Sequence, residues 1–378
     1  MSVARRTYSP TATVAAANAA AAHGSARAAA GASASPTPAI LRTIARRATA
    51  TIAGLLLWGT VAGCGSTTFV GDLPPAAEPA VSPRLEQRPA GRIVPIGNAP
   101  EGAAADPVTG LVAVGLREPD RLALVDGTSG EVTTRVPLPG APRHLGLAGL
   151  GGPVLVPAER ADELIRVALP GGRADDVPVG VFPHDAVAAA GRIFVGDERG
   201  NTISVVDGDR VRRIPVATQP GGLAPVDGGR VLAVVSVRER VVELYDTRTL
   251  ERLGQAPAGA GPTHVVPGSE GRIYVVDTTG DGLLVFETRP ELRLTRRLAL
   301  LGAPYGLAVD PEHGRLWVTL TATNEVVELA AGARPHVLRT LPSVRQPNTV
   351  AVDPATGRAY ITGSADGVLQ LLDPPRRR

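Results

Sequence analysis

Short apolar stretches separated by turn residues recur along the chain from Gly91 to its C-terminal end. Each repeat has a proline, an apolar stretch, a turn, a second apolar stretch, a polar loop, a third apolar stretch that ends in an acidic residue, and then a fourth. Apolar stretches this short, with no amphipathic helical segment between them, are typical of β-strands. The pattern therefore predicts an all-β fold with four strands in each repeat.

The proline that opens each repeat sets the number of repeats. Successive prolines are 42, 41, 37, 42, 42 and 43 residues apart, and residues 91–373 span 283 residues, or about 40 per repeat. Four strands in about 40 residues are typical of a β-propeller blade. We therefore predict a seven-bladed β-propeller over residues 91–373. The seven marker prolines are Pro100, Pro142, Pro183, Pro220, Pro262, Pro304 and Pro347.

The ends of the repeat region predict how the ring closes. The last repeat stops at Asp373, after its third strand, and Arg92-Ile-Val-Pro-Ile96 resembles the fourth-strand segments Arg213-Ile-Pro-Val216 and Arg135-Val-Pro-Leu138. We expect the N-terminal strand, at about residues 91–97, to complete the C-terminal blade and so remove an exposed sheet edge. The alternative is an independent N-terminal strand beside an incomplete last blade.

Several second strands share an aromatic motif. It reads Trp317-Val-Thr, Tyr360-Ile-Thr, Tyr274-Val-Val-Asp277 and Phe194-Val-Gly-Asp197, and one repeat also carries Pro304-Tyr-Gly-Leu-Ala-Val-Asp310. These units resemble the YVTN-repeat family of seven-bladed propellers over about residues 91–373, although all four lack the Asn that ends the family motif, and the second and fourth repeats are degenerate. The resemblance implies the fold and no particular function, because the family has varied roles. Similar repeats occur in streptogramin-lyase-like, quinoprotein-dehydrogenase-like and haem d1-type propellers, so the resemblance leaves an enzyme open.

The segment before the repeats has the features of an export signal. The apolar run over residues 51–63 follows Arg42, Arg46 and Arg47, which is the order of a secretory signal, and the run is too short to span a bilayer. Val61-Ala62-Gly63-Cys64 resembles the bacterial lipobox, in which the cysteine receives a lipid before cleavage. We expect a signal peptide over residues 41–63 and a lipid on Cys64, which would anchor the protein to the outer face of the cytoplasmic membrane in the cell envelope. The alternative is a free, buried cysteine beside an ordinary core strand.

The segments outside the repeats have simpler interpretations. Residues 1–40 are rich in alanine and have no apolar periodicity, which indicates a disordered extension or a mis-assigned start. Residues 64–90 contain five prolines after the cysteine and predict an extended tether that holds the domain off the membrane. Residues 374–378 form a basic tail, which we interpret as solvated.

The charge balance argues against nucleic acid as a partner. The chain has a net charge of +3, but six arginines and no acidic residue precede Cys64, so the remainder has 33 basic and 36 acidic residues. A net charge of −3 does not suit sequence-independent binding of phosphates.

Three histidines are the candidate functional residues of the ring. His144, His184 and His264 follow a marker proline by one or two residues, where a propeller chain enters the inner strand beside the channel. Asp197 and Asp277 lie 13 residues after His184 and His264, at the end of the second strand, which returns to the same face. Imidazole and carboxylate together suit a divalent metal, so His184, Asp197, His264 and Asp277 form a candidate metal site. The alternative is that these polar residues satisfy strand ends and channel water.

Further residues near the marker prolines extend the candidate ligand surface. Arg143, Asp185 and Tyr305 lie beside the three histidines in the entry loops. Charged pairs also recur after the second strand, and we interpret them as a solvated rim of local ion pairs. These pairs are Arg117-Glu118, Glu159-Arg160, Glu198-Arg199 and Arg238-Glu239.

The sequence favours a binding function over catalysis. It has no Gly-x-Ser-x-Gly nucleophile motif, no phosphate-binding GxxxxGK[ST] loop and no CxxCH haem-attachment motif. No cofactor is firmly implied, and no catalytic residue is identified. We expect a monomeric binding or protein-interaction module whose partner is an envelope protein or a glycan. The alternative is a lyase-like or dehydrogenase-like enzyme with a metal or cofactor at the channel and His184 or His264 as its base.

Overall fold

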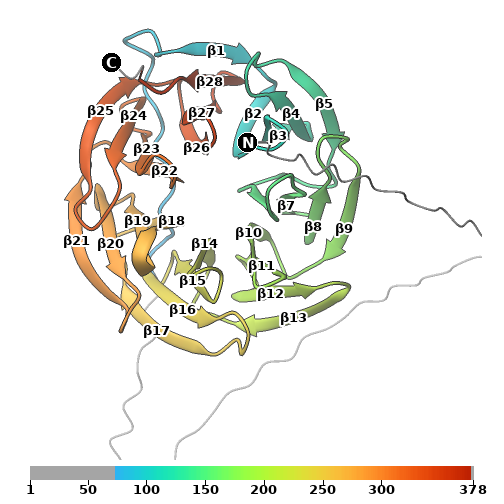
Figure 1. Ribbon diagram of the computed structural model, residues 1–378, viewed down its shortest axis with the longest axis vertical. Helices are drawn as coiled ribbons and strands as arrows, with labels where there is room; N and C mark the ends of the chain where they lie inside the picture. The colour runs from blue at the N-terminus through green and yellow to red at the C-terminus, as the bar shows by residue number, and fades with distance from the viewer. Residues whose placement is uncertain (1–72, 376–378) are drawn as a thin grey trace, which may run out of the picture. The chain divides into compact units, whose positions relative to one another are not determined.

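The computed structural model of the chain describes residues 73–375, which form a seven-bladed β-propeller (Figure 1). Each blade is a four-stranded antiparallel sheet, and its first strand lies nearest the channel. The predicted fold class and blade number are confirmed. Among residues 73–375, no helix has the length and apolar character needed to cross a bilayer. The predicted extension, the signal peptide, Cys64 and residues 376–378 lie outside the described residues.

The strands follow blade by blade in chain order. Blade 1 contains β2 (Asn98–Asp106), β3 (Leu111–Glu118), β4 (Asp120–Asp126) and β5 (Val132–Pro137), and blade 2 contains β6 (Gly146–Leu147), β7 (Val154–Ala158), β8 (Glu163–Val167) and β9 (Ala174–Pro178). Blade 3 contains β10 (Pro183–Ala189), β11 (Arg192–Asp197), β12 (Thr202–Asp207) and β13 (Arg210–Pro215). Blade 4 contains β14 (Pro220–Val226), β15 (Val231–Ser236), β16 (Val241–Asp246) and β17 (Arg252–Pro257).

The second half of the chain continues the order and returns to the start of the ring. Blade 5 contains β18 (Pro262–Pro267), the short 3₁₀ turn η1 (Ser269–Gly271), β19 (Arg272–Asp277), β20 (Gly282–Glu287) and β21 (Arg293–Ala299). Blade 6 contains β22 (Pro304–Asp310), β23 (Arg315–Leu320), β24 (Glu325–Ala330) and β25 (His336–Pro342). Blade 7 contains β26 (Pro347–Asp353), β27 (Arg358–Gly363) and β28 (Val368–Leu372), and β1 (Arg92–Pro95) pairs antiparallel with β28 as its outer strand.

A β-bulge follows the marker proline in six of the seven blades. In blade 3 the bulge leaves His184 unpaired between Pro183 and Asp185, and in blade 5 it leaves Thr263 and His264 unpaired. A bulge changes the direction of the side chains at the unpaired positions. The two histidines are each the last unpaired residue before pairing resumes, which explains why they hold equivalent places although one follows its proline by one residue and the other by two.

The core consists of seven hydrophobic clusters, each formed between two neighbouring blades. Trp317, Tyr274 and Phe194, from the aromatic motif, are among the largest fully buried side chains. The Tyr274 hydroxyl of blade 5 accepts a hydrogen bond of 2.6 Å from the Gly332 amide of blade 6. The motif therefore serves packing between blades and not ligand binding.

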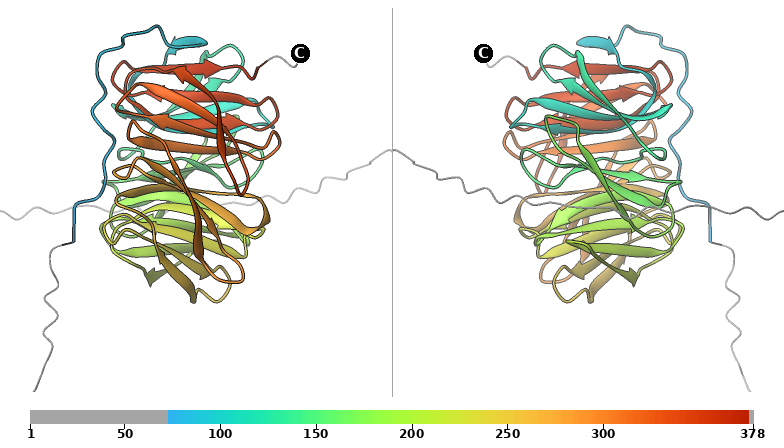
Figure 2. Two further views of the ribbon diagram at one scale, coloured as in Figure 1. Left: turned by 90° about the vertical axis from the view of Figure 1, so that its left-hand side faces the viewer. Right: turned by 90° about the vertical axis from the view of Figure 1, so that its right-hand side faces the viewer.

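Residues 73–83, which we name the strap, lie extended along one face of the propeller (Figure 2). The strap bonds to Arg238, Thr321 and Gln346. Arg238 and Thr321 lie in loops between second and third strands, and Gln346 lies in a marker-proline loop, so both kinds of loop belong to this face. The chain continues to Ala90, whose amide donates to the Pro342 carbonyl at 2.9 Å. Residues 73–90 of the predicted tether are thus bound to the propeller, and residues 64–72 lie outside the described residues.

Candidate binding site at the channel mouth

Four side chains from four blades meet at the channel beneath the strap. The ring centroid of His144 is 4.8 Å from that of His184 and 4.4 Å from that of His264. The Nε2 atoms of His144 and His264 are 3.0 Å apart, and Tyr305 packs edge-on against His264 with centroids 4.7 Å apart. The structure thus brings together the three histidines and the tyrosine that the sequence places in the entry loops.

Two of the imidazoles are neutral at physiological pH. Burial, together with the positive charges of His184 and Arg143, lowers the pKa of His264 to about 3. The pKa of His144 also lies well below its ordinary value, first because of burial and then because of His264 and His184. A hydrogen bond between two Nε2 atoms requires that one carries a proton and donates it, while the other is unprotonated and accepts the hydrogen bond. Two neutral imidazoles in opposite tautomers satisfy this contact.

Two glutamates flank His184. The Nδ1 atom of His184 is 3.0 Å from Glu198 Oε2 and 4.0 Å from Glu159 Oε1. The other oxygen of each glutamate accepts a different hydrogen bond. The side-chain Nε2 of Gln219 donates to Glu198 Oε1 at 2.6 Å, and Arg117 donates to Glu159 Oε2 at 2.6 Å. Burial alone would raise the pKa of Glu198, but the hydrogen bond and charge of His184, together with Gln219, lower it to about 2.

These glutamates correct the interpretation of the charged pairs as a solvated rim. Glu159 is only 2% exposed, and it accepts the Arg117 guanidinium from the neighbouring blade. The sequence signal was present, because both glutamates immediately follow a second strand in blades with a channel histidine. It was missed because a charged pair in a loop usually faces solvent.

Arg143 and Tyr305 complete the polar surface. Arg143 lies 3.8 Å from Glu159 on one side and 3.8 Å from Glu78 of the strap on the other. Burial opposes its charge, but Tyr305, Glu101, Glu159 and Glu78 together raise the pKa of Arg143 above its ordinary value. Burial also raises the pKa of the Tyr305 hydroxyl, which stays protonated. The site therefore offers a permanent cation and a hydroxyl donor beside two neutral imidazoles.

The two aspartates expected in the metal site lie elsewhere. Asp197 is fully buried and accepts hydrogen bonds from the Gly180 amide at 3.0 Å and from the hydroxyls of Thr202 and Ser204 at 2.6 and 2.9 Å. Asp277 is equally buried and accepts the amides of Ala260, Gly261 and Gly280 at 3.0, 2.8 and 3.1 Å. Both carboxylates satisfy loop amides, so the predicted set of His184, Asp197, His264 and Asp277 does not come together.

Asp185 also has a structural role. Its carboxylate accepts the Leu223 amide of blade 4 at 2.8 Å and the Ala186 amide of its own blade at 2.8 Å. Burial raises the pKa of this carboxyl, against the effect of those hydrogen bonds. The residue therefore joins the inner strands of two blades instead of facing the ligand surface.

The space at the channel mouth is small because the strap covers it. Ala76, Ala77 and Glu78 of the strap line a cavity of about 20 Å³ together with Arg143, His184, Glu198, His264 and Tyr305. Such a volume holds about one water molecule. A larger ligand can reach the histidines on this face only if the strap moves.

A metal could be held by a different set of residues from the one predicted. Ligand atoms of Glu159, His184 and Glu198 all lie within 4.8 Å of one another. The oxygens of the two glutamates that face His184 are those not held by Arg117 or Gln219. Two carboxylate oxygens and an imidazole suit Zn²⁺ or Mn²⁺. The donor set fits a divalent ion, provided that His184 Nδ1 carries no proton.

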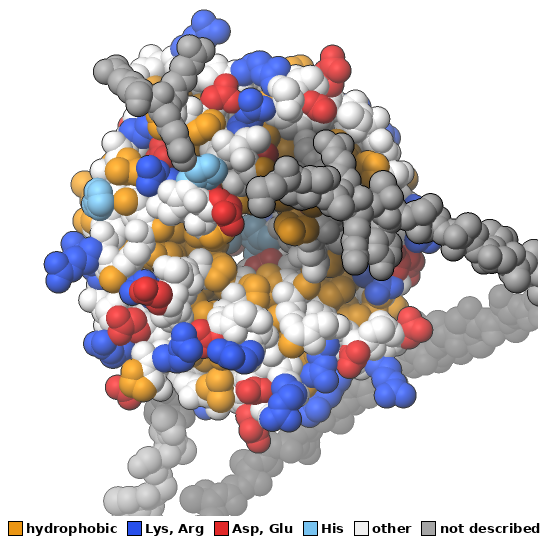
Figure 3. All heavy atoms as spheres, viewed as in Figure 1, with side chains coloured by type: hydrophobic (Ala, Val, Ile, Leu, Met, Phe, Trp, Pro, Cys, Tyr) orange, Lys and Arg blue, Asp and Glu red, His pale blue; other side chains and the backbone are white. Residues whose placement is uncertain are grey.

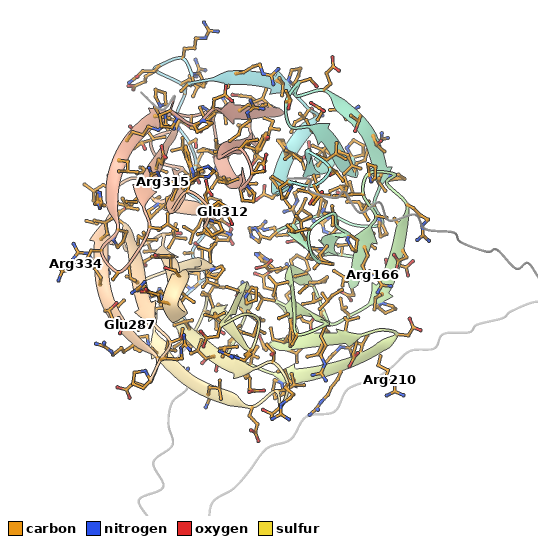
Figure 4. The ribbon with its side chains drawn as sticks, viewed as in Figure 1. Arg166, Arg210, Glu287, Glu312, Arg315 and Arg334 are labelled. Carbon is orange, nitrogen blue, oxygen red and sulfur yellow. The ribbon has the colours of Figure 1, made fainter. Side chains whose placement is uncertain are left out.

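Away from this site, charged side chains reach the surface of the propeller. On the face opposite the strap, side chains of both charges lie mainly toward the outer rim of the ring (Figure 3). Arg166, Arg210 and Arg334 project from its outer edge (Figure 4). Arg166 pairs there with Asp175, whose side chain is half exposed. Pairs of this kind contribute little to stability or recognition.

Comparisons with known proteins show the fold alone. No family model matches the sequence, and no curated protein matches it. Solved structures with a similar fold include hydrazine synthase of Kuenenia stuttgartiensis, with a TM-score of 0.66 and 15% identity over 74% of this chain and 97% of that chain. A streptogramin B lyase has a TM-score of 0.65 and 12% identity over 75% and 98% of the two chains.

A third similar structure comes from a protein assembly. A chain in the mitotic checkpoint complex has a TM-score of 0.66 and 14% identity over 81% of this chain and 97% of its own. Fold and site together thus define a seven-bladed β-propeller with a polar, strap-covered channel mouth. A fold of this kind hosts many unrelated functions, so these likenesses show the architecture alone.

Proposed function

We propose that this protein is a lipid-anchored β-propeller of the bacterial cell envelope that acts as a binding module through its channel mouth. The convergence of His144, His184, His264 and Tyr305 from four blades carries the proposal. Polar side chains that only satisfy strand ends bond to nearby main chain, as Asp197 does. The four rings instead contact one another and have Arg143 and two glutamates around them, which suits the orientation of a polar ligand.

The anchor rests on the lipobox-like residues before Cys64. A single lipid on Cys64 would keep the propeller at the outer face of the cytoplasmic membrane, within reach of an envelope protein or a glycan. Mass spectrometry of the N-terminal peptide from membranes should find Cys64 at the N-terminus with a lipid attached. A Cys64→Ala variant should leave the membrane fraction. An unmodified Cys64, or an unchanged distribution of the variant, would contradict the anchor.

Crosslinking in intact cells tests the binding site itself. A variant with His144, His184 and His264 all changed to Ala should lose the crosslinked envelope partner that the unmodified protein retains. His313→Ala and His336→Ala serve as matched controls, because both residues lie outside the channel cluster. If all variants retain the same partner equally, the histidine cluster is not the binding site.

A propeller enzyme is the second candidate, favoured by the Glu159, His184 and Glu198 cluster. A divalent ion bound by these residues would act as a Lewis acid toward a substrate at the channel mouth. A virginiamycin B lyase of Staphylococcus aureus has the same fold, and a histidine-to-alanine variant of that enzyme is catalytically inactive. Metal analysis of protein purified without chelator should then find about one ion per chain, lost in Glu198→Gln and kept in His313→Ala. Protein without stoichiometric metal would contradict this candidate.

A further inference from the structure

The strap is held mainly through its main chain. Arg238 donates to the carbonyls of Leu73 and Pro74 at 2.6 and 3.2 Å. Thr321 Oγ1 accepts the Ala80 amide at 3.0 Å. Gln346 accepts the Ser82 amide at 3.0 Å and donates to the Ala80 carbonyl at 2.9 Å, and Asn324 donates to the Pro83 carbonyl at 3.0 Å. Side chains of the propeller thus recognise atoms that every peptide possesses.

Side chains of the strap also contact the propeller, and these contacts limit which residues a bound segment can have at a few positions. Ala77 lies so close to the propeller that a Cβ placed on Gly261 would be 2.8 Å from its own Cβ. Ala76 packs against the hydrophobic cluster between blades 4 and 5. Glu78 faces Arg143 at 3.8 Å, and Pro79 follows it. The face therefore fits two small residues followed by an acid and a proline.

Residues of the strap line one cavity together with His184 and His264. The strap has no strand pairing of its own, and Glu78 is 71% exposed. Hydrogen bonds at a solvent-exposed face exchange readily with water or with a competing chain, because their net contribution is small. A segment held in this way can be replaced by another of the same chemistry.

We propose that this face is a receptor for extended peptide segments of the type small-small-acidic-proline, and that the strap is its built-in occupant, which a segment of a partner protein displaces. The proposal rests on the proposed binding function and names the class of its ligand. Displacement exposes His184 and His264 in the same step, because the strap covers the cavity that they line. Recognition of the extended main chain makes the receptor tolerant of sequence elsewhere in the segment.

Peptide binding to the full chain tests this proposal. The probe is a fluorescein-labelled peptide of residues 73–84, and the receptor is a strap-release variant, Ala77→Trp with Ser82→Ala. The larger side chain cannot fit over Gly261, and the second change removes the Ser82 hydroxyl that bonds to Thr321 and Gln346. Fluorescence anisotropy should show at least tenfold tighter binding to this variant than to the unmodified protein, whose face the strap occupies.

Two further variants identify the binding surface. Adding Gln346→Ala to the release variant should weaken peptide binding at least tenfold. Adding Arg345→Ala should leave it unchanged, because the neighbouring Arg345 side chain contacts Ala365 and Asp366 instead of the strap. Equal binding in both would contradict the proposed surface.

Hydrogen exchange shows whether the strap is released. The Ala80 and Ser82 amides should exchange at least tenfold faster in the release variant, and excess peptide should accelerate them in the unmodified protein. Unchanged exchange in both, or fast exchange without peptide binding, would overturn the proposal. Neither result would affect the crosslinking test, which depends on the histidines and not on Gln346, so failure of this inference is distinguishable from failure of the proposed function.

Discussion

Asp197 and Glu198 are adjacent in sequence, yet they belong to two different regions of the molecule. Asp197, the last residue of β11, is fully buried and accepts the Gly180 amide. Glu198 lies one residue later and contacts His184 at the channel mouth. Successive side chains of an extended chain point to opposite sides. The acid that ends a second strand therefore stabilises the blade, and the acid that follows it faces the ligand surface.

Glu159 repeats this relation in blade 2. The strand β7 ends at Ala158, and Glu159 follows it into contact with Arg117 and Arg143. Asp277 ends β19 and accepts three loop amides, as Asp197 accepts one. The position of an acidic residue relative to the end of the second strand therefore decides its role. The acid that ends the strand stabilises the blade, and the acid that follows it faces the channel mouth.

Of the substitutions compared at neutral pH, replacement of the buried acid should give the largest effect. Asp197→Ala removes the acceptor of one amide and two hydroxyls at a fully buried position, which should lower the free energy of unfolding by about 3 kcal/mol. Glu198→Gln, one residue away, should cost less, about 1 to 2 kcal/mol, because glutamine loses the charge but keeps a side-chain oxygen that can accept hydrogen bonds from His184 and Gln219. Urea denaturation measures both. Equal losses would show that the two acids have the same role.

Lowering the pH should reduce the free energy of unfolding, because groups at the channel mouth bind protons more readily in the unfolded chain. The folded-state pKa of His264 is about 3, below that of an unfolded chain, so the unfolded state binds more protons between about pH 6.5 and pH 3. The free energy of unfolding is then largest above pH 6.5 and falls by about 1.4 kcal/mol per pH unit from His264 as the pH decreases through this window. Glu198, with a folded-state pKa of about 2, adds a loss in the same direction below its ordinary value of 4.5.

The His264→Ala variant isolates that contribution. Its free energy of unfolding, measured by urea denaturation at pH 7 and pH 5, should depend less steeply on pH than that of the unmodified protein. An unchanged slope would mean that His264 is not buried in a neutral form.

Removal of Arg117, the cation that pairs with Glu159, should cause a smaller loss of the free energy of unfolding. Arg117→Ala leaves the buried Glu159 with only the more distant Arg143, which should lower the free energy of unfolding by about 1 to 2 kcal/mol. The exposed pair Arg166 and Asp175 is the control, because Arg166→Ala should cost less than about 0.5 kcal/mol. Thermal or urea denaturation distinguishes the two, and equal losses would place Glu159 in solvent.

The smallest effect concerns the strap. Glu78→Gln removes a carboxylate that is 71% exposed and 3.8 Å from Arg143, so the free energy of unfolding should change by less than about 0.5 kcal/mol. The hydrogen exchange of the Ala80 amide should change little, because that bond goes to Thr321 and not to Arg143. A large loss of stability would mean that the ion pair, and not the main chain, holds the strap.

The fold was predictable because its signals are local and repeated. Turn spacing, marker prolines and short apolar strands recur about every 40 residues, so no single degenerate repeat changes the result. Blade 2 illustrates this, since β6 is reduced to Gly146 and Leu147 while β7, β8 and β9 form normally. Periodicity predicts the number of blades even where one strand is weak.

The site was only partly predictable because it depends on bulges and loop paths. The marker prolines placed His144, His184 and His264 together, but one residue of register decides whether Asp197 or Glu198 accompanies them. The predicted tether gave no sign that Leu73 to Pro83 would bind the channel face, since its contacts use main-chain atoms that carry no sequence signal. Patterns of residue type predict strands far better than they predict contacts made by the main chain.

The protonation of the channel histidines tests most directly whether side chains of several blades form one buried site. Nuclear magnetic resonance of protein with ¹⁵N-labelled histidine, assigned with His144→Ala and His264→Ala variants, reports charge and tautomer from pH 8 to pH 5. We predict that His144 and His264 stay neutral throughout and hold opposite tautomers, because their Nε2 atoms share one proton across 3.0 Å. If either imidazole instead titrates near pH 6.5, as an exposed histidine does, the site is not assembled as described.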